Sequence, residues 1–266
     1  MLAPDTCNVR GMTKTAIITG SDSGIGKASA VALARAGFDI GITWHEDEAG
    51  AQATCAEVRS HGRRAEIRRL DLAQLPKAAD VIDDLAAAFE RIDVLVNNSA
   101  TSRGEKFVDL AFDDWRHTLT VDLDGAFLCA QRAARRMIAQ GGGGRIVNIT
   151  SVHEHTPLPT SFAYTVAKHG LGGLTKCLAL ELAPHRILVN SVAPGLVATP
   201  MTDMEDADVR RIHKPNIPIS RPADAREVAS LVAWLCSDGA TYTTGQSFIV
   251  DGGFMLVNPS TIESND

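Results

Sequence analysis

Short apolar runs alternate with longer amphipathic stretches along the chain from Thr15 to Val250. The apolar runs, typical of buried parallel strands, occupy residues 15–19, 39–44, 65–70, 92–96, 145–150, 186–192 and 247–250. Helical patterns lie between them, one ending at Ala36 and others spanning 48–60, 75–90, 112–140, 161–182 and 224–236. This alternation predicts an α/β fold with one doubly wound parallel sheet of about seven strands, flanked by helices on both faces.

The pattern contains no repeat and no break between domains, so we expect a single domain over residues 13–257. Residues 1–12 are predicted to form a disordered extension, and residues 258–266 a C-terminal tail. Periodicity fades from about residue 196 to about residue 222, among methionines, acidic residues and prolines. This composition predicts a mobile loop or short helices that form a lid over the substrate.

Composition and charge limit the classes of partner. The 266 residues are 45% hydrophobic, with a net charge of −6 and a pI near 5.7. Nucleic acids and anionic membranes are bound through clustered basic surfaces, so neither is an expected partner. No apolar run approaches the ~20 residues that a membrane span requires.

The cysteines predict a reducing environment. There are five, an odd number, and they are scattered without a C-x-x-C pair: Cys7, Cys55, Cys129, Cys177 and Cys236. This pattern is typical of free thiols in a cytoplasmic protein and argues against a disulfide framework or a zinc site. We therefore predict no metal.

A glycine-rich turn follows the first strand. The strand ends at Gly20, and Gly24-Ile25-Gly26 opens the helix that follows. Glycines at such a turn let the backbone approach a pyrophosphate, and the helix N-terminus offers free N–H groups to the anion. The spacing G-x-x-x-G-x-G differs from the commoner G-x-G-x-x-G, and a plain strand-to-helix turn is the alternative.

A second candidate site spans Ser151 to Lys168. Ser151 follows an apolar run, and Tyr164 and Lys168 stand four residues apart in a helical pattern, so they share one face of that helix. A nearby ammonium favours the phenolate form of tyrosine, which suits the pair to proton transfer. Taken alone, Y-x-x-x-K is a weak signal.

Six motifs occur together and in order: Thr19-Gly20-x-x-x-Gly24-Ile25-Gly26, Asn97-Asn98-x-Ala100, Ser151, Tyr164-x-x-x-Lys168, Pro194-Gly195 with Thr199, and Gly245-Gln246 with Asp251-Gly252-Gly253. From about Thr13 to about Leu256 the chain resembles the short-chain dehydrogenase/reductase family, in particular its bacterial 3-oxoacyl-carrier-protein reductase and glucose 1-dehydrogenase branch. The resemblance implies a Rossmann-type fold. It also implies an NAD(P)-dependent oxidoreductase that moves a hydride between a nicotinamide cofactor and a ketone, sugar or 3-oxoacyl substrate.

The resemblance also assigns roles to the second candidate site. Tyr164 would exchange a proton with the substrate oxygen, and Lys168 would hold the nicotinamide ribose and favour the phenolate. Ser151 would hydrogen-bond the carbonyl or alcohol. Donors placed on the carbonyl oxygen beforehand stabilise the negative charge that develops there during hydride transfer.

The implied cofactor site draws on several strand ends. The residues that would form the cofactor site are Gly20, Ser23, Gly24, Ile25, Gly26, Trp44, His45, Asp71, Leu72, Asn97, Ser99, Ala100, Tyr164, Lys168, Pro194, Gly195, Val197 and Thr199. Within this set, Asp71 and Leu72 would meet the adenine and Asn97 the adenosine ribose. Thr199 and the backbone at Pro194 and Gly195 would fix the carboxamide.

Two positions depart from the family pattern. Asp122 stands where the family usually has Asn, the fourth member of a proton relay. We assign Asp122 to the catalytic set, since the backbone carbonyl at that position binds the relay water in the family. Ser99 replaces the usual Ala of Asn-Ala-Gly, and we expect only a small local adjustment.

The end of the second strand bears on cofactor choice. NAD enzymes commonly carry an acid there, which holds the ribose 2′-OH and repels a 2′-phosphate. Trp44 followed by His45 fills that place, which favours NADP(H) over NAD(H). The family's usual basic residue before the second motif glycine is also missing, because Ser23 stands there, and Glu46 could still reach the ribose.

Residues near the predicted catalytic serine are candidates for substrate contact. His153-Glu154-His155 resembles a metal-binding cluster, but it lacks helical spacing and a fourth ligand, so a loop lining the substrate entrance is favoured. His153 could bond a substrate hydroxyl or only pack the loop. Met201 could cover the pocket or lie in a surface loop. Ser151 and Tyr164 complete the predicted substrate contacts.

A non-catalytic nucleotide sensor or scaffold on the same fold is the alternative function. It is disfavoured because a sensor has no need of Ser151, Tyr164 and Lys168 together. The long helical patterns at 112–140 and 161–183 carry wide apolar faces. In relatives such helices pair across a two-fold axis, so we expect a homotetramer.

Overall fold

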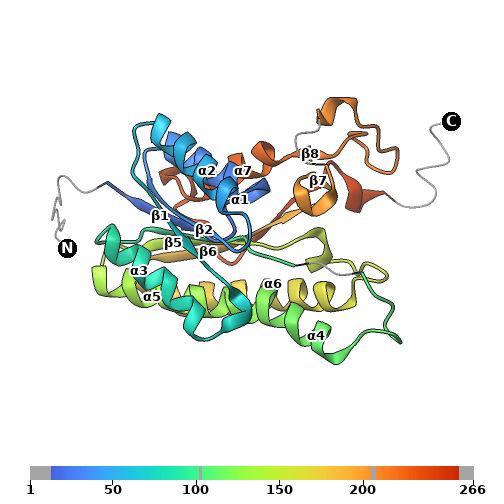
Figure 1. The fold of residues 1–266 in the computed structure, drawn as a ribbon, viewed down its shortest axis with the longest axis horizontal. Helices are drawn as coiled ribbons and strands as arrows, with labels where there is room; N and C mark the ends of the chain where they lie inside the picture. Colours follow the sequence, from blue (N-terminus) through green and yellow to red (C-terminus); the bar gives the residue numbers. More distant parts are fainter. Residues whose placement is uncertain (1–12, 102–103, 205–207, 258–266) are drawn as a thin grey trace.

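The computed structural model describes residues 13–101, 104–204 and 208–257 (Figure 1). The predicted extension at 1–12 and the tail at 258–266 lie outside the described residues. Seven parallel strands form the main sheet in the order β3-β2-β1-β4-β5-β6-β9. They are β1 (Thr15–Ile18), β2 (Asp39–Trp44), β3 (Ala65–Arg69), β4 (Val94–Asn97), β5 (Gly144–Ile149), β6 (Ile187–Pro194) and β9 (Ser247–Val250). The predicted doubly wound parallel sheet is confirmed.

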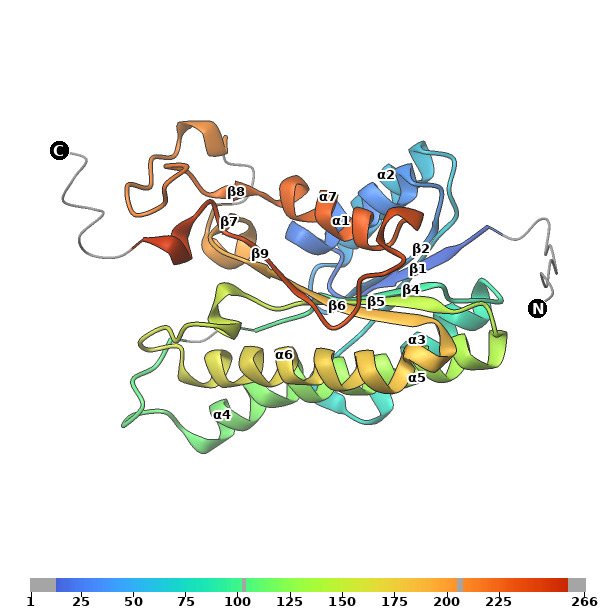
Figure 2. The same cartoon turned by 180° about the vertical axis from the view of Figure 1, so that it is seen from behind.

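Helices cover both faces of the sheet, as Figures 1 and 2 show from opposite sides. One layer holds α1 (Gly24–Arg35), α2 (Glu48–Ser60) and α7 (Ala225–Leu235). The other holds α3 (Asp80–Ala88), α4 (Phe112–Leu119), α5 (Gly125–Gln140) and α6 (Phe162–Leu182). In the part of the chain that the structure describes, no helix combines the length and apolarity needed to cross a membrane.

Side chains of successive strand residues pack into two separate hydrophobic cores, because they alternate between the two faces of the sheet. In β1, Ala16 and Ile18 pack with the layer of α1 and α7, whereas Ile17 packs with that of α3 and α5. All three side chains are fully buried. The two cores hold the sheet between the helix layers and fix the carboxyl ends of its strands along one edge.

The stretch 112–140, predicted to be mostly helical, is helical throughout, with a π-helical turn at Thr120–Asp124 between α4 and α5. A second helix prediction is wrong in its start. The helix predicted at 75–90 begins only at Asp80, after the short 3₁₀ turn Lys77–Ala79. Pro76 explains the delay, since the residue before a proline is driven from helical geometry, and Leu75 is extended with φ −70° and ψ 152°.

The predicted lid segment contains short elements. They are a two-residue strand, β7 (Val197–Ala198), and the 3₁₀ turns Pro200–Thr202 and Val209–Arg211. β7 pairs with β8 (Ala223–Asp224), which leads directly into α7.

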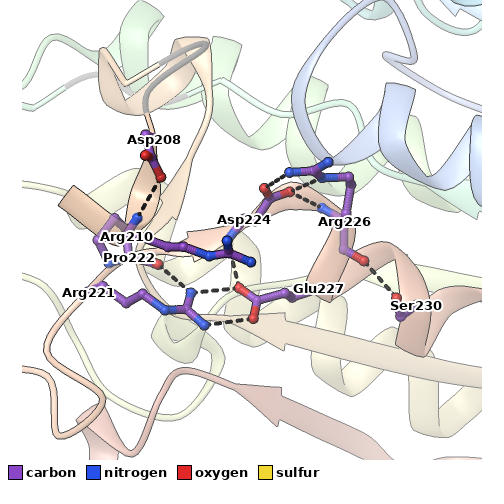
Figure 3. A network of polar contacts seen from close by, with 8 residues as sticks. All are labelled: Asp208, Arg210, Arg221, Pro222, Asp224, Arg226, Glu227 and Ser230. Carbon is purple, nitrogen blue, oxygen red and sulfur yellow. Dashed lines mark hydrogen bonds and ion pairs between the residues drawn. The ribbon is translucent and has the colours of Figure 1, made fainter. Parts of the chain in front are cut away.

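Ion pairs fasten the end of this segment to α7 (Figure 3). Arg221 donates two hydrogen bonds of 2.8 Å to the carboxylate of Glu227. Arg226 pairs with Asp224, whose side chain together with Glu227 forms a capping box on the helix. The guanidinium of Arg221 lowers the pKa of Glu227. These largely exposed pairs fix local geometry more than they add stability.

Candidate functional site

A cleft of about 940 Å³ opens at the carboxyl ends of the strands. Ligands of doubly wound sheets bind at this edge. Most predicted site residues line it: Gly20, Ser23, Gly24, Ile25, Trp44, His45, Asp71, Leu72, Ser99, Ala100, Ser151, His153, Tyr164, Lys168, Pro194, Gly195, Val197, Thr199 and Met201. Three predicted residues, Gly26, Asn97 and Asp122, do not line the cleft and lie behind it.

The turn after β1 is shaped to receive an anion. Gly20 and Gly24 have φ of +60° and +53°, the left-handed region that glycine tolerates best. Ser23 is the N-cap of α1, and among the described residues its side chain caps none of the helix N–H groups. The first turn of α1 carries no carboxylate. Free N–H groups and the positive helix end therefore fit the pyrophosphate of a dinucleotide.

Gly26 serves the turn from behind. A Cβ at this position would lie 2.0 Å from the carbonyl oxygen of Gly20. The glycine thus permits α1 to pack directly on the turn.

Asn97, predicted to meet the adenosine ribose, has its side chain turned into the protein interior. Its side chain is buried, and its Nδ2 donates to the carbonyl oxygen of Ala126 (3.2 Å) and to Oδ1 of Asn148 (2.9 Å). It therefore ties β4 to α5 and β5, and it is not among the residues that line the cleft. The following residue, Asn98, lines the cleft and donates from its side chain to the carbonyl oxygens of Thr19 and Gly20 (3.0 and 2.8 Å).

Ser151, Tyr164 and Lys168 converge at the centre of the cleft. Ser151 lies two residues after the end of β5, as the N-cap of the 3₁₀ turn Val152–Glu154, and its Oγ accepts a hydrogen bond from the backbone N–H of His153 at 3.1 Å. The hydroxyl hydrogen of Ser151 is thereby left to donate to a ligand. The Lys168 ammonium lies 5.2 Å from the centre of the Tyr164 ring, one helical turn away as predicted.

Lys168 is held by buried acceptors. Its Nζ donates to the carbonyl oxygen of Ile149 at 3.3 Å and lies 3.4 Å from Oδ2 of Asp122. The other carboxylate oxygen of Asp122 accepts from the backbone N–H of Thr101 at 2.7 Å. Burial raises the pKa of Asp122, and the nearby Lys168 and the Thr101 N–H oppose that rise. The π-helical turn places Asp122 here, as such turns often do at functional sites.

The adenosine end of the cleft combines an aromatic ring with polar groups. Trp44 ends β2, and His45 follows with its Nε2 at 3.5 Å from Oδ1 of Asp71. The Asp71 side chain also caps the turn that starts at Leu72, accepting from the N–H of Ala73 at 3.0 Å. An adenine would have an apolar contact here and a carboxylate close to its polar edge.

In the His-Glu-His run, His153 faces the cleft, whereas Glu154 and His155 share the hydroxyl of Ser247. His153 lines the cleft and its Nδ1 lies 3.0 Å from the carbonyl oxygen of Thr156. Glu154 is buried, and its Oε2 accepts from the hydroxyls of Thr150, Ser191 and Ser247 at 2.7, 3.2 and 2.9 Å. His155 bonds the Ser247 hydroxyl from the other side at 3.0 Å. The three side chains do not converge on a single metal position.

The far wall of the cleft comes from β6 and the lid segment. Gly195 lies against Asp251, where a Cβ would be 2.9 Å from that residue's own Cβ. Thr199 and Thr202 form a capping box on the 3₁₀ turn that carries Met201. Thr199 also closes over the glycine turn, since a Cβ on Gly24 would meet its methyl group at 3.2 Å.

Other lining residues were not found from the sequence. They include Asn98, Thr101, His117, Val121, Leu158, Asn216, Ile217 and Phe254. His117 lies in the long helical stretch, and Ile217 and Phe254 come from segments without periodicity. Only the Asn97-Asn98 repeat carried a signal, because either amide could have faced the ligand.

Comparison with known proteins finds oxidoreductases that are similar to this chain along nearly its whole length. A family profile described as "Enoyl-(Acyl carrier protein) reductase" matches residues 20–255. The chain is 63% identical over 248 residues to the "Uncharacterized oxidoreductase YohF" of Escherichia coli (strain K12), covering 93% of this chain and 98% of the relative.

Relatives of the predicted branch also match. The 3-oxoacyl-[acyl-carrier-protein] reductase FabG of Aquifex aeolicus is 40% identical, over 90% of this chain and 96% of its own length. Glucose 1-dehydrogenase 2 of Bacillus subtilis is 34% identical, over 94% and 97%. The predicted resemblance to this branch is confirmed.

Solved structures extend the similarity to three dimensions. The acetoin dehydrogenase YohF of Salmonella typhimurium is 64% identical with a TM-score of 0.90, covering 93% of this chain and 98% of its own. The carveol dehydrogenase of Mycobacterium avium, solved in complex with NAD, is 28% identical with a TM-score of 0.85 over 93% and 99%.

Proposed function

We propose that this chain, which belongs to the short-chain dehydrogenase/reductase family, reduces small ketones of the acetoin type and oxidises the corresponding secondary alcohols. As a family member it is an oxidoreductase that transfers a hydride between a nicotinamide cofactor and a carbonyl or secondary-alcohol substrate. The convergence of Ser151, Tyr164 and Lys168 in the cleft beside the glycine turn carries the proposal.

The chain's own groups supply the proton chemistry. The bound nicotinamide supplies or accepts the hydride. The Ser151 hydroxyl, fixed by the His153 N–H, and the Tyr164 phenol donate to the carbonyl oxygen, and Tyr164 releases its proton to that oxygen. Lys168 stabilises the phenolate that remains. Because the donors are in place before reaction, they stabilise the developing oxyanion without reorganisation.

The substrate end of the cleft supports a small substrate. The cleft is lined in part by the apolar side chains of Leu158, Met201, Ile217 and Phe254, and the imidazole of His153 also lines it. A compact ketone with one further polar group suits such a lining. The named activity of the solved acetoin dehydrogenases, 64% and 63% identical to this chain, points the same way.

A substrate panel tests the proposal. The full chain is mixed with NADPH or NADH and with acetoin, glucose and an acetoacetyl thioester, and nucleotide absorbance is followed. We expect kcat/KM to be highest for acetoin. Turnover of the thioester or of glucose alone would contradict the acetoin assignment. Firm nucleotide binding without any turnover would support a sensor or scaffold instead.

We further propose NADP(H) as the preferred cofactor. The last residue of β2 is Trp44, so the carboxylate that would repel a 2′-phosphate is missing at that place, and the imidazole of His45 follows. Wild type should give a higher kcat/KM with NADPH than with NADH. Trp44→Asp should move the preference toward NADH. A strong preference of wild type for NADH would overturn this choice.

We also propose a homotetramer located in the cytoplasm. Phe107, Phe112 and Phe162 are exposed by 68%, 72% and 42%, and they gather beside α4 and α6. Ile249 is 46% exposed on the edge strand β9, which would form the second interface. Cys55, Cys129, Cys177 and Cys236 are free thiols, which suits a reducing compartment. Light scattering at micromolar concentration should give four times the chain mass, and a monomer would contradict the assembly.

A further inference from the structure

Building on the reductase function proposed above, we infer that His153 sets the substrate class. Its Nε2 accepts a hydrogen bond from a hydroxyl on the carbon next to the reacting carbonyl. The pocket therefore selects α-hydroxy ketones over ketones that lack this hydroxyl, and the reverse reaction takes vicinal diols.

The hydrogen-bond partner of Nδ1 fixes the tautomer. Nδ1 of His153 lies 3.0 Å from the carbonyl oxygen of Thr156. A carbonyl oxygen can only accept, so Nδ1 carries the hydrogen. In the neutral imidazole Nε2 then has a lone pair and no hydrogen, which makes it an acceptor.

The ring stands beside the reaction centre. His153 and Tyr164 both line the cleft, with ring centroids 6.4 Å apart and planes at 73°. The backbone N–H of His153 donates to Ser151, and the neighbouring side chains of Val152 and Glu154 are buried, so the turn is held on both sides. Among the described residues, no protein group shares a hydrogen bond with Nε2.

The pocket thus offers two kinds of polar group at adjacent positions. Ser151 and Tyr164 provide donors, which a carbonyl oxygen requires. Nε2 of His153 provides an acceptor, which a hydroxyl one carbon away can satisfy by donating. Leu158, Met201 and Ile217 line the same cleft and add apolar surface to it. A methyl ether at the same carbon cannot donate and would leave Nε2 unpaired.

Three ketones of similar size test the inference. We would measure kcat/KM of the full chain for acetoin, 3-methoxy-2-butanone and 2-butanone at about pH 8, where a free imidazole is neutral. A neutral hydrogen bond predicts that wild type prefers acetoin to each of the other two by about 10-fold.

Two variants separate the acceptor from the loop contact. His153→Asn can still donate to the Thr156 carbonyl, but its side chain ends short of Nε2, so the preference should fall about 10-fold, to near equality. His153→Gln brings an amide oxygen to the place of Nε2 and should recover part of the preference. Melting temperature and cofactor titration establish that each variant is folded. If only one of the two variants folds, its preference among the three ketones is enough to test the role of His153.

Several outcomes would overturn the role of His153. Equal kcat/KM for the three ketones in wild type would do so, as would an unchanged preference in His153→Asn; in both cases the reductase function stands. If wild type binds the nucleotide and reduces none of the ketones, the proposed function fails as well.

Discussion

The carboxylate of Asp122 lies 3.4 Å from the ammonium of Lys168, and both side chains are buried. A carboxylate at this place accepts hydrogen bonds, as it does from the N–H of Thr101. It therefore connects the loop after β4 to the helix that carries Tyr164. An asparagine at this position could keep the Thr101 contact but not the charge.

This pair predicts a pH-dependent difference in stability. Burial raises the pKa of Asp122, against the influence of Lys168, the Thr101 N–H and His117, so the folded state holds this proton more tightly than the unfolded chain. Its contribution to stability is then present at acid pH and is lost as pH rises from the ordinary value of about 3.9 through the raised one. Asp122→Asn has no such titration.

The melting temperature of wild type should therefore fall relative to that of Asp122→Asn as the pH rises above the ordinary carboxyl pKa of about 3.9, because the pKa of Asp122 is raised in the folded state. Scanning calorimetry at several pH values measures the difference. Asp109→Asn, at an exposed aspartate, is the control and should follow wild type throughout. If the melting temperatures of wild type and Asp122→Asn changed in parallel with pH, the pKa of Asp122 would be the same in the folded and the unfolded state, and the prediction would be wrong.

The two tyrosines of the chain provide a matched pair for the proton donor. Tyr164 lines the cleft, whereas Tyr242 is fully exposed. Tyr164→Phe removes the acid and should lower kcat by roughly 10²–10⁴-fold, with the dissociation constant for the nucleotide nearly unchanged. Tyr242→Phe should match wild type in both. Substantial turnover by Tyr164→Phe would assign the proton transfer to another group.

Periodicity in the sequence predicted the scaffold well and the interior of the site less well. The bounds predicted for β2 and α2 agree with the structure, because each is an unbroken pattern of one period. The π-helical turn around Asp122 was missed, since its residues keep a helical hydrophobic pattern. Asn97 and Asn98 could not be told apart, because which amide turns inward depends on Asn148, 51 residues away. Phe254 reaches the cleft through tertiary packing alone.

Gly26 provides a test of the turn. A methyl group there would meet the Gly20 carbonyl, which belongs to the backbone and cannot move aside. Gly26→Ala should lower the free energy of unfolding by about 1–3 kcal/mol and weaken nucleotide binding, because the turn shifts away from α1. Urea denaturation and a fluorescence titration measure the two effects. Gly142→Ala, at a glycine with open space around it, should change neither, and a wild-type-like Gly26→Ala would refute the packing role.

Glu154 is predicted to hold the turn that carries Ser151 and His153. One buried carboxylate accepts from hydroxyls on Thr150, Ser191 and Ser247, so it joins the residue after β5 to the middle of β6 and the start of β9. Glu154→Ala leaves these hydroxyls without their acceptor and opens a cavity, so the free energy of unfolding should fall by about 2–4 kcal/mol. Because Ser151 follows Thr150 directly, kcat should fall as well. Glu181→Ala, at an exposed position on α6, should stay within about 0.5 kcal/mol of wild type. A stable Glu154→Ala with full kcat would show that the turn is held without the carboxylate.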